Sequence, residues 1–311
     1  MELPLVTIVI PVLNRENLLP DAIRSVIEQT HSNWELFVVD DGSTDHTVEI
    51  ARSFSDPRIN VMVLPHNGNI GKLRNIGAQA GTGKWITFLD SDDLWVRERI
   101  AMQMKALEKE SKLWGFGAHQ VVDENGKPFS IQHRQEKAAS GWVTRDLITC
   151  RTSASIGSIM VERTLFESVC GFSCDPELLF REDYELAIRL SASAEALATD
   201  EVLVLVREHN NRSTHQFDEG HLRTAQTCEH LIHYFEDEEY RQLLRKKKAY
   251  HLAEASVQSC KKKRFAFAGK QVWEALVEGD NIGHIISVGY RCAETLLQAD
   301  KEKNGEHEKI A

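Results

Sequence analysis

The first hundred residues alternate between short apolar runs and helical patterns, and this alternation constrains the fold more than any other feature of the sequence. Four runs are rich in β-branched or aromatic residues and apolar on both faces: 6–11, 35–41, 59–64 and 84–90. Between them, apolar residues recur at helical spacing in 18–29, 47–54 and 70–80. Such strands, alternating with helices, are typical of an α/β fold with a mostly parallel sheet flanked by helices.

After residue 95 the pattern is less regular, and near residue 217 it changes character. Further strand-like runs lie at 114–123, 156–161 and 202–209. Helical patterns lie at 97–110, 163–169 and 182–193. The polar segment 130–155 is predicted to be a loop, and residues 218–311 are helical in pattern, with basic clusters at 246–248 and 261–264. We therefore expect an α/β domain over 1–217, with halves of about 1–95 and 96–217, and a helical C-terminal region over 218–311.

Composition removes several classes of function. The chain carries 47 acidic and 37 basic residues, a net charge of −10, so it lacks the basic field that attracts nucleic acid. Its six cysteines are scattered, as expected for reduced thiols in the cytoplasm. No apolar stretch approaches the roughly 18–20 residues that a membrane span needs. We expect a cytoplasmic protein that binds anionic ligands locally, through a metal ion or a few cations.

Polar residues follow four of the predicted strands. They occupy positions 11–15, 40–43, 90–93 and 209–211. Because ligands of open parallel sheets bind beyond the carboxyl ends of the strands, these four tips should converge on one crevice. The crevice would hold up to five carboxylates and one imidazole, from Asp40, Asp41, Asp90, Asp92, Asp93 and His209.

The segment F-L-D-S-D-D-L-W at 88–95 has the densest negative charge of these tips. One carboxylate can cap the following helix, but three so close together repel each other and need a counter-charge. Closely spaced carboxylates suit Mg²⁺ or Mn²⁺, held by one or two protein ligands and by substrate phosphates. The spacing does not match a helix–loop–helix calcium site, a P-loop or a dinucleotide fingerprint. For 40–43 alone, a turn or a helix cap explains the residues as well as a ligand contact does.

Four motifs that occur in order carry a resemblance to a known family. They are V-T-I-V-I-P-V-L-N-R at 6–15, E-L-F-V-V-D-D-G-S-T-D at 35–45, G-N-I-G-K-L-R-N-I-G-A-Q-A at 68–80 and G-T-G-K-W-I-T-F-L-D-S-D-D-L-W at 81–95. Over about residues 4–215 the chain resembles the family 2 glycosyltransferases of the GT-A fold. The resemblance implies an inverting enzyme that moves one sugar from a nucleotide-diphosphate sugar to an acceptor hydroxyl, with Mn²⁺ or Mg²⁺ as cofactor.

In that family the donor lies against the first strand tips and the helix that faces them. The resemblance implies donor contacts at Pro11, Leu13, Arg15, Asp40, Asp41, Arg74 and Asn75. The segment Asp90-Ser91-Asp92 matches the family's D-x-D, whose carboxylates hold the cation that bridges the diphosphate. Asp92 is the expected direct ligand, Asp93 is close enough to share the role, and His209 is expected as a second metal ligand or a diphosphate contact.

The segment F-R-E-D-Y-E-L-A-I-R-L at 180–190 supplies the acidic pair that the family has at the start of a later helix. The resemblance implies Asp183, or failing that Glu182, as the general base on the acceptor hydroxyl. From the residues alone, this pair is ordinary complementation of a helix dipole, and His209 is an ordinary surface histidine. The Gln-x-x-Arg-Trp signature of processive synthases is absent, which favours transfer of one sugar at a time.

The resemblance makes a UDP-sugar the expected donor and a glycan or lipid-linked acceptor of cell-surface polysaccharide synthesis the expected partner. The basic clusters have two interpretations, peripheral contact with the inner face of a membrane or solvated faces of packed helices, and an oligomer is compatible with the sequence. Two other functions stay open. A sugar nucleotidyltransferase would carry a glycine-rich basic loop where 11–15 stands, and a nucleotide-sugar-binding or scaffold protein would have a degenerate transferase domain.

Overall fold

A computed structural model describes residues 3–124, 126–129, 140–209, 219–262 and 264–278, with positions 284, 287–288 and 291–292. The chain divides into two units, residues 1–212 and 213–311, and each is described by itself. Positions 210 and 211, residues 130–139 of the predicted loop and most of the C-terminal tail lie outside the described residues.

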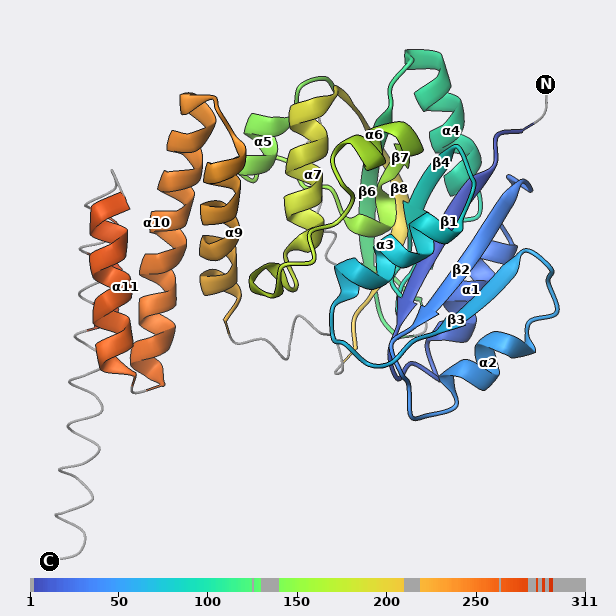
Figure 1. The fold of residues 1–311 in the computed structure, drawn as a ribbon, viewed down its shortest axis with the longest axis horizontal. Coiled ribbons are helices and arrows are strands. Elements are labelled where there is room, and N and C mark those ends of the chain that lie inside the picture. The colour runs from blue at the N-terminus through green and yellow to red at the C-terminus, as the bar shows by residue number, and fades with distance from the viewer. Residues whose placement is uncertain are drawn as a thin grey trace, which may run out of the picture. The chain divides into compact units, whose positions relative to one another are not determined.

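The first unit is built on a sheet of eight strands in the order β3-β2-β1-β4-β7-β6-β8-β5 (Figure 1). The strands are β1 (Val6–Val12), β2 (Trp34–Asp40), β3 (Ile59–Val63), β4 (Trp85–Phe88), β5 (Leu94–Trp95), β6 (Trp114–Val122), β7 (Met160–Glu162) and β8 (Ala196–Arg207). The first four strands pair in parallel, as do β6 and β8. Strand β7 runs antiparallel to β4 and β6, and β5 runs antiparallel to β8. The predicted α/β class is confirmed.

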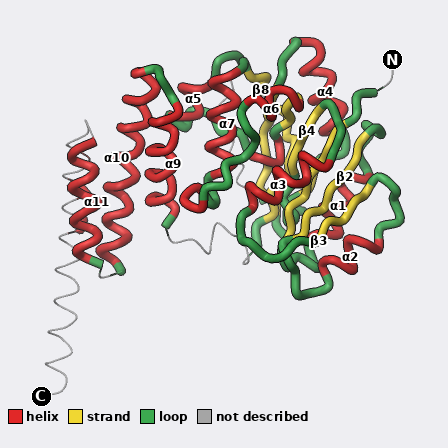
Figure 2. The backbone as a smooth tube through the Cα atoms, viewed as in Figure 1, coloured by secondary structure: helices red, strands yellow, loops and turns green. Residues whose placement is uncertain are grey.

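Helices cover both faces of the parallel half, as the tube in Figure 2 shows. Helix α1 (Leu19–Ile27) packs on the face that Ile8 and Ile10 of β1 present. Helix α3 (Ile70–Ala80) lies on the other face, where a Cβ on Gly77 would come within 2.4 Å of Cγ1 of Val9. Glycine at 77 therefore lets α3 approach the sheet closely, and α3 carries residues 74 and 75 beside the strand tips.

Three elements differ from the sequence-based expectations. Strand β8 begins at Ala196 and not near 202, because a bulge opposite Gly117 and Ala118 leaves Asp200 and Glu201 exposed and breaks the apolar pattern. A short helix forms inside the predicted loop, and a 3₁₀ turn at Ile156–Ser158 precedes β7. The other helices of this unit are α2 (Thr47–Ser53), α4 (Arg99–Glu110), α5 (Thr144–Ile148), α6 (Arg163–Ser168) and α7 (Glu182–Ser193).

The described part of the second unit includes helices α9 (Gly220–Tyr234), α10 (Glu238–Lys261) and α11 (Phe265–Glu278), which share a core of their own. Lys248, from the first basic cluster, lies 2.5 Å from Glu229 of α9 and 2.8 Å from Glu278 of α11. This lysine therefore ties the three helices together and is not a free surface charge. Among the described residues, no helix combines the length and the apolar character that crossing a membrane needs.

Candidate active site

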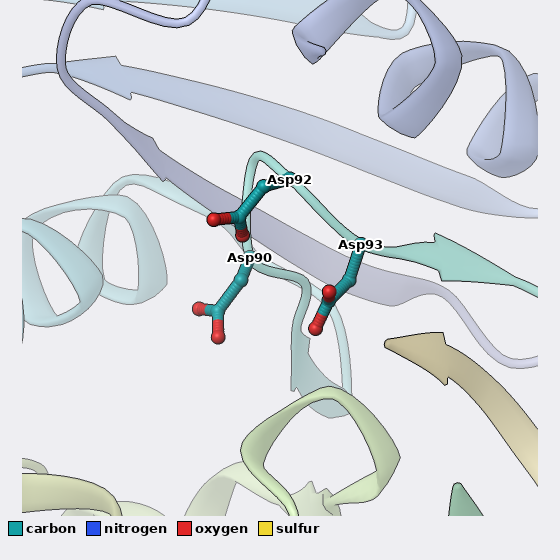
Figure 3. Close-up of side chains that lie close together, drawn as sticks. All are labelled: Asp90, Asp92 and Asp93. Atoms are coloured by element: carbon teal, nitrogen blue, oxygen red, sulfur yellow. The ribbon is translucent and has the colours of Figure 1, made fainter. Parts of the chain in front are cut away.

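The turn that follows β4 gathers three aspartates at the carboxyl edge of the sheet. Leu89 is fully buried, so the chain that carries these side chains is anchored in the core. Oxygen atoms of Asp90, Asp92 and Asp93 lie within 4.8 Å of one another. Figure 3 shows the three side chains leaving this one turn between β4 and β5.

Arg74 of α3 links this turn to the start of α7. Its Nη2 donates to Oδ1 of Asp90 at 2.7 Å, and its Nη1 donates to Oε1 of Glu182 at 2.6 Å. The guanidinium is buried, with 2% of the side chain exposed. One positive charge faces two carboxylates here, and burial raises the pKa of both Asp90 and Glu182 although the charge of Arg74 opposes it.

Asp92 meets basic side chains from two other strand tips. Its Oδ2 lies 3.1 Å from Nε2 of His209, which follows β8, and 3.9 Å from Nε of Arg15, which follows β1. Burial acts to raise the pKa of Asp92, but the hydrogen bond with His209 and the charge of Arg15 hold it below the ordinary value. Three strand tips therefore converge on one ionised carboxylate.

Asp93 is held by backbone. Its Oδ1 accepts the N–H of Arg207 at 3.0 Å, at the last residue of β8. The guanidinium of Arg207 is itself buried and donates to the backbone oxygens of Asp92 and Leu18. Asp93 therefore fastens the turn to β8 and brings His209, two residues further on, to Asp92. Ser91 is buried in the same turn.

Asp40, at the end of β2, shapes the turn that follows it. Its Oδ2 accepts the N–H groups of Gly42 and Ser43, each at 3.0 Å. Gly42 adopts a φ of +78°, and a Cβ there would lie 3.0 Å from the backbone nitrogen of His66. Glycine is required at this position because the turn is both left-handed and crowded.

Asp41 organises the loop after β3. Its Oδ1 accepts the N–H of Asn67 at 3.0 Å, and its Oδ2 accepts that of Gly68 at 2.9 Å. Nδ1 of His66 lies 2.8 Å from Oδ2, and this imidazole is 60% exposed. The sequence alone gives no reason to expect His66 at this site. The one indication nearby is the Asn67-Gly68 pair, which marks a turn soon after β3.

The tip of β1 lies against the turn after β2. Pro11 is buried in the strand beside Val39, and Leu13 is half-buried beyond it. The N–H of Asn14 donates to Oγ of Ser43 at 2.8 Å. The side chain of Asn14 in turn accepts the N–H of the residue after Ser43, also at 2.8 Å. The two tips therefore form one connected edge.

The hydrogen bonds of Asn75 and Asp183 are made with residues outside the aspartate turn. The carboxamide of Asn75 donates to the oxygen of Phe172 and accepts its N–H, both at 2.9 Å, so it fastens α3 to the segment after α6. Asp183 is half-buried in the first turn of α7, where its Oδ1 accepts the N–H of Tyr184 at 2.7 Å. Glu182 is buried beside it, and its Oε2 has no hydrogen-bond partner among the described residues.

The donor set of the turn fits a hard divalent cation. It offers carboxylate oxygens from Asp90 and Asp92, whose side chains are 31% and 19% exposed, with one imidazole nitrogen beside them. Mg²⁺ and Mn²⁺ prefer such oxygen ligands and keep positions for water or phosphate. Asp93, which already accepts a backbone N–H, is the least exposed of the three aspartates.

The fold and the acidic turn agree with the class of protein that the sequence comparison identifies, the glycosyltransferases. The chain belongs to glycosyl transferase family 2. The sequence model of this family matches residues 7–184, which is more than half of the chain. The family assignment made from the motifs is confirmed, and with it the assignment as an enzyme.

Solved structures share the fold. S. aureus TarS residues 1–349, in complex with UDP-GlcNAc, has a TM-score of 0.66 at 15% identity over 97% of this chain and 92% of that chain. The mannosyltransferase PcManGT from Pyrobaculum calidifontis, in complex with GDP-Man and Mn²⁺, has a TM-score of 0.61 at 17% identity over 94% and 81%.

A sequence relative is the Escherichia coli protein WfgD, a UDP-Glc:alpha-D-GlcNAc-diphosphoundecaprenol beta-1,3-glucosyltransferase. The two are 35% identical over 121 residues, which is 39% of this chain and 48% of WfgD. The chain thus spans about half the length of this relative, and about half of the Bacillus subtilis relative TuaG.

Proposed function

We propose that the chain transfers one sugar from a uridine diphosphate sugar to an acceptor hydroxyl, with inversion at the anomeric carbon and with Mn²⁺ or Mg²⁺ as cofactor. The observation that carries this proposal is the pair of ion contacts from Arg74, which joins the aspartate turn to the start of α7. The turn would hold the donor phosphates through a cation, and α7 would bring a base to the acceptor. One buried guanidinium therefore aligns the two halves of the reaction.

The donor nucleotide would lie along the tips of β1 and β2. Pro11, Leu13 and Arg15 would line one side, and Asp41 would act mainly by shaping the loop at 66–68, since its oxygens already accept backbone N–H groups. The complexes of TarS with UDP-GlcNAc and UDP, and the UDP-Glc in the name of WfgD, support uridine. The GDP-Man bound by PcManGT makes guanosine diphosphate sugars the alternative to test.

The cation would be held by Asp92 and Asp90, with Asp93 in the same turn and His209 beside them. When bound, it withdraws charge from the leaving nucleoside diphosphate. Arg15, whose Nε lies 3.9 Å from Oδ2 of Asp92, would contact a donor phosphate. Its charge would then face the phosphates as well as the carboxylate.

Asp183 would act as the general base. It is half-buried in the first turn of α7, whereas Glu182 is turned inward against Arg74. Asp183 would take the acceptor proton while the oxygen attacks the face of the anomeric carbon opposite the diphosphate, and the configuration inverts. Arg74 and Asn75, whose polar atoms hold other parts of the chain, would act as positioning residues instead of the donor contacts expected from the family.

The acceptor would be a lipid-linked glycan of cell-surface polysaccharide synthesis. The diphosphoundecaprenol acceptor in the name of WfgD supports this class. Such an acceptor presents its glycan at a membrane surface, so the enzyme would work in the cytoplasm and in peripheral contact with the inner face of the membrane.

A ligand screen with the purified chain tests the proposal. In the presence of Mn²⁺, a UDP-sugar should raise the unfolding temperature, because a ligand that binds only the folded state stabilises it. Release of UDP should follow and should stop when EDTA is added. Binding without any release of nucleotide would favour a scaffold role, and synthesis of a nucleotide sugar from UTP and a sugar phosphate would indicate a nucleotidyltransferase.

A further inference from the structure

Helix α11 buries Gln271 and two alanines, and it exposes several large apolar side chains. Ala268 and Ala275 are 3% and 0% exposed and belong to the core of the helical unit. By contrast, Trp273 is 67% exposed and Val277 is 69% exposed. Phe267, at 40%, adds to the same surface, and Leu276, at 44%, lies at its edge next to Trp273. A helix between a protein core and water normally turns its large apolar side chains to the core and its polar ones to the water. Large apolar side chains on the exposed side indicate contact with another apolar surface.

The exposed side chains form one face. Positions 267, 270, 273 and 277 follow each other at intervals of three or four residues, which places them on one side of the helix over about 15 Å. Lys270 and Glu274 also lie within this face, and the ammonium of Lys270 is 3.6 Å from the carboxylate of Glu274. An apolar face that contains a tryptophan and a long cationic side chain is typical of helices that lie in the headgroup region of a bilayer.

Cations gather at one end of this face. Lys261 and Lys262 end α10, Arg264 precedes α11, and all three are exposed, although Arg264 also contacts Glu219 at 3.4 Å. Four acidic residues, 236–239, stand at the other end of α10. Because α10 has 24 residues, the two ends are about 36 Å apart. The charge next to α11 is therefore locally positive in a chain that is acidic as a whole.

We propose that the α11 face, made of Phe267, Trp273, Leu276 and Val277 and flanked by Lys261 and Lys262, docks on an anionic lipid bilayer. The helix would lie along the headgroups with its apolar side chains in the upper acyl region and its lysines at the phosphates. No described helix could span the bilayer, so the contact is peripheral. The inference adds a surface to the membrane contact proposed above, but it rests on the helical unit alone.

The available area argues against a second copy of the chain as the occupant. A large aromatic side chain buries roughly 150–250 Å² when fully covered, so these four partly exposed side chains offer on the order of 400 Å². A stable protein interface takes about 800 Å² from each partner. A bilayer has no such minimum, because attraction between lysines and anionic lipids adds to the burial of a small apolar face.

Vesicle sedimentation with the full chain tests the inference. The protein should pellet with phosphatidylcholine vesicles that contain phosphatidylglycerol, much less with phosphatidylcholine alone, and less as the salt concentration rises. The double variant Trp273→Glu/Val277→Glu should bind at least about tenfold more weakly. Met102→Glu is the matched control, since Met102 is an exposed apolar residue of α4, 37% accessible, and this variant should bind as the wild type does. Circular dichroism should show that all three proteins are folded.

A second measurement locates the contact. Vesicles with brominated acyl chains should quench the tryptophan fluorescence of the wild type, and this quenching should fall in Trp273→Phe, which still pellets. The inference is overturned if the wild type does not pellet with phosphatidylglycerol or if the double variant pellets equally well. A dimer that the double variant loses, without vesicle binding, would assign the face to a second copy. Donor binding tests the transferase proposal separately and should be the same in every variant.

Discussion

Two groups of aspartates follow strands at the same edge of the sheet, yet they are held in different ways. Asp40 and Asp41, after β2, accept hydrogen bonds from backbone N–H groups of the loops around them. Asp90 and Asp92, after β4, contact basic side chains: Arg74 for the first, and His209 and Arg15 for the second. A backbone donor cannot leave without unfolding its loop, whereas a side chain can rotate away. The first group therefore holds structure, and the second can exchange its partners for a ligand.

Distance along the chain separates the contacts that a sequence reveals from those that it hides. The donors to Asp40 are two and three residues away, whereas those to Asp41 are 26 and 27 residues away. The partners of Asp90 and Asp92 are 16 and 117 residues away. A strand-end aspartate therefore has the same local signature in both cases, and its role depends on distant side chains.

Replacing Asp92 should give the largest effect on activity. Asp92→Asn removes the charge that would bind the cation. Because a cation in such a site stabilises the transition state by several kcal/mol, turnover should fall at least about 10³-fold. The unfolding temperature should fall much less, because the asparagine can still bond the buried His209 and Arg15 is 20% exposed. Steady-state transfer with saturating donor measures the effect, and Asp56→Asn, at an ion pair with Arg58 outside the site, is the control. Near-normal turnover would remove the metal role from the turn.

The next largest effect should come from the two acidic residues that begin α7, whose substitutions should lower turnover by different factors. Asp183→Asn removes the proposed base and should lower turnover about 10²–10³-fold, with the donor dissociation constant unchanged in calorimetry. Glu182→Gln keeps the shape of the contact with Arg74 and should reduce turnover by a smaller factor. A larger loss in Glu182→Gln than in Asp183→Asn would exchange the two assignments.

Local patterns were enough to predict much of the fold. The strands β1–β4 and helices α1–α3 have strong, short-range periodicity, and they appear where the sequence analysis expected them, within a few residues. The early part of β8 was missed because its bulge exposes Asp200 and Glu201 and so destroys the pattern. The two-residue strand β5 is too short to leave a pattern of its own, since its position depends on pairing with β8.

The candidate site was predictable as a collection of residues but not as a set of contacts. The strand-end rule indicated that Arg15, Asp92 and His209 would meet, and these side chains lie together. The direction of Arg74 could not be inferred, because it depends on where α7 places Glu182, a residue 108 positions away. The anchoring of Asp93 likewise depends on the backbone of Arg207. Site chemistry is therefore visible in residue types, and its geometry needs the fold.

Substitution of Arg74 tests how strongly a side-chain partner holds Asp90 in the second group of aspartates. Arg74→Met would leave the buried Glu182 and the partly exposed Asp90 without their cation and should lower the free energy of unfolding by about 3 kcal/mol, as for other broken buried pairs. Arg74→Lys should lose less, since it keeps the charge but cannot contact both carboxylates in the same way. Urea denaturation measures both. The matched control Arg24→Met breaks an exposed pair with Asp21 and should cost less than about 1 kcal/mol. Equal losses at 24 and 74 would contradict the bridge.

Substitution of Asp41 tests the aspartates that accept backbone N–H groups, and its expected effect on stability is smaller. Asp41→Asn replaces one accepting oxygen by an NH₂ group that faces a backbone N–H, so stability should fall by about 1–2 kcal/mol. The donor KM should rise because the loop at 66–68 loosens, while turnover at saturating donor stays close to that of the wild type. A collapse of turnover with unchanged stability would move Asp41 into the group that contacts the reacting atoms.

The smallest expected effect is a pair of opposite pH slopes at the site. Burial raises the pKa of Glu182, so the folded state holds this proton more tightly than the unfolded chain does. Its stabilising contribution is complete below the ordinary glutamate pKa and is lost as the pH rises through the folded pKa. The unfolding free energy of the wild type minus that of Glu182→Gln should therefore decrease as the pH rises from about 4 toward neutrality.

Asp92 provides the reference for this measurement. The pKa of Asp92 lies below the ordinary value despite burial, because His209 and Arg15 favour its charged form. Its contribution is present above the ordinary aspartate pKa and is lost as the pH falls through the folded pKa. The difference between wild type and Asp92→Asn should therefore grow with rising pH, in the opposite sense to Glu182→Gln. Denaturation curves across acidic pH measure both slopes. If they had the same sign, the carboxylate beside Arg74 and the one beside His209 would not be held in the different electrostatic states described above.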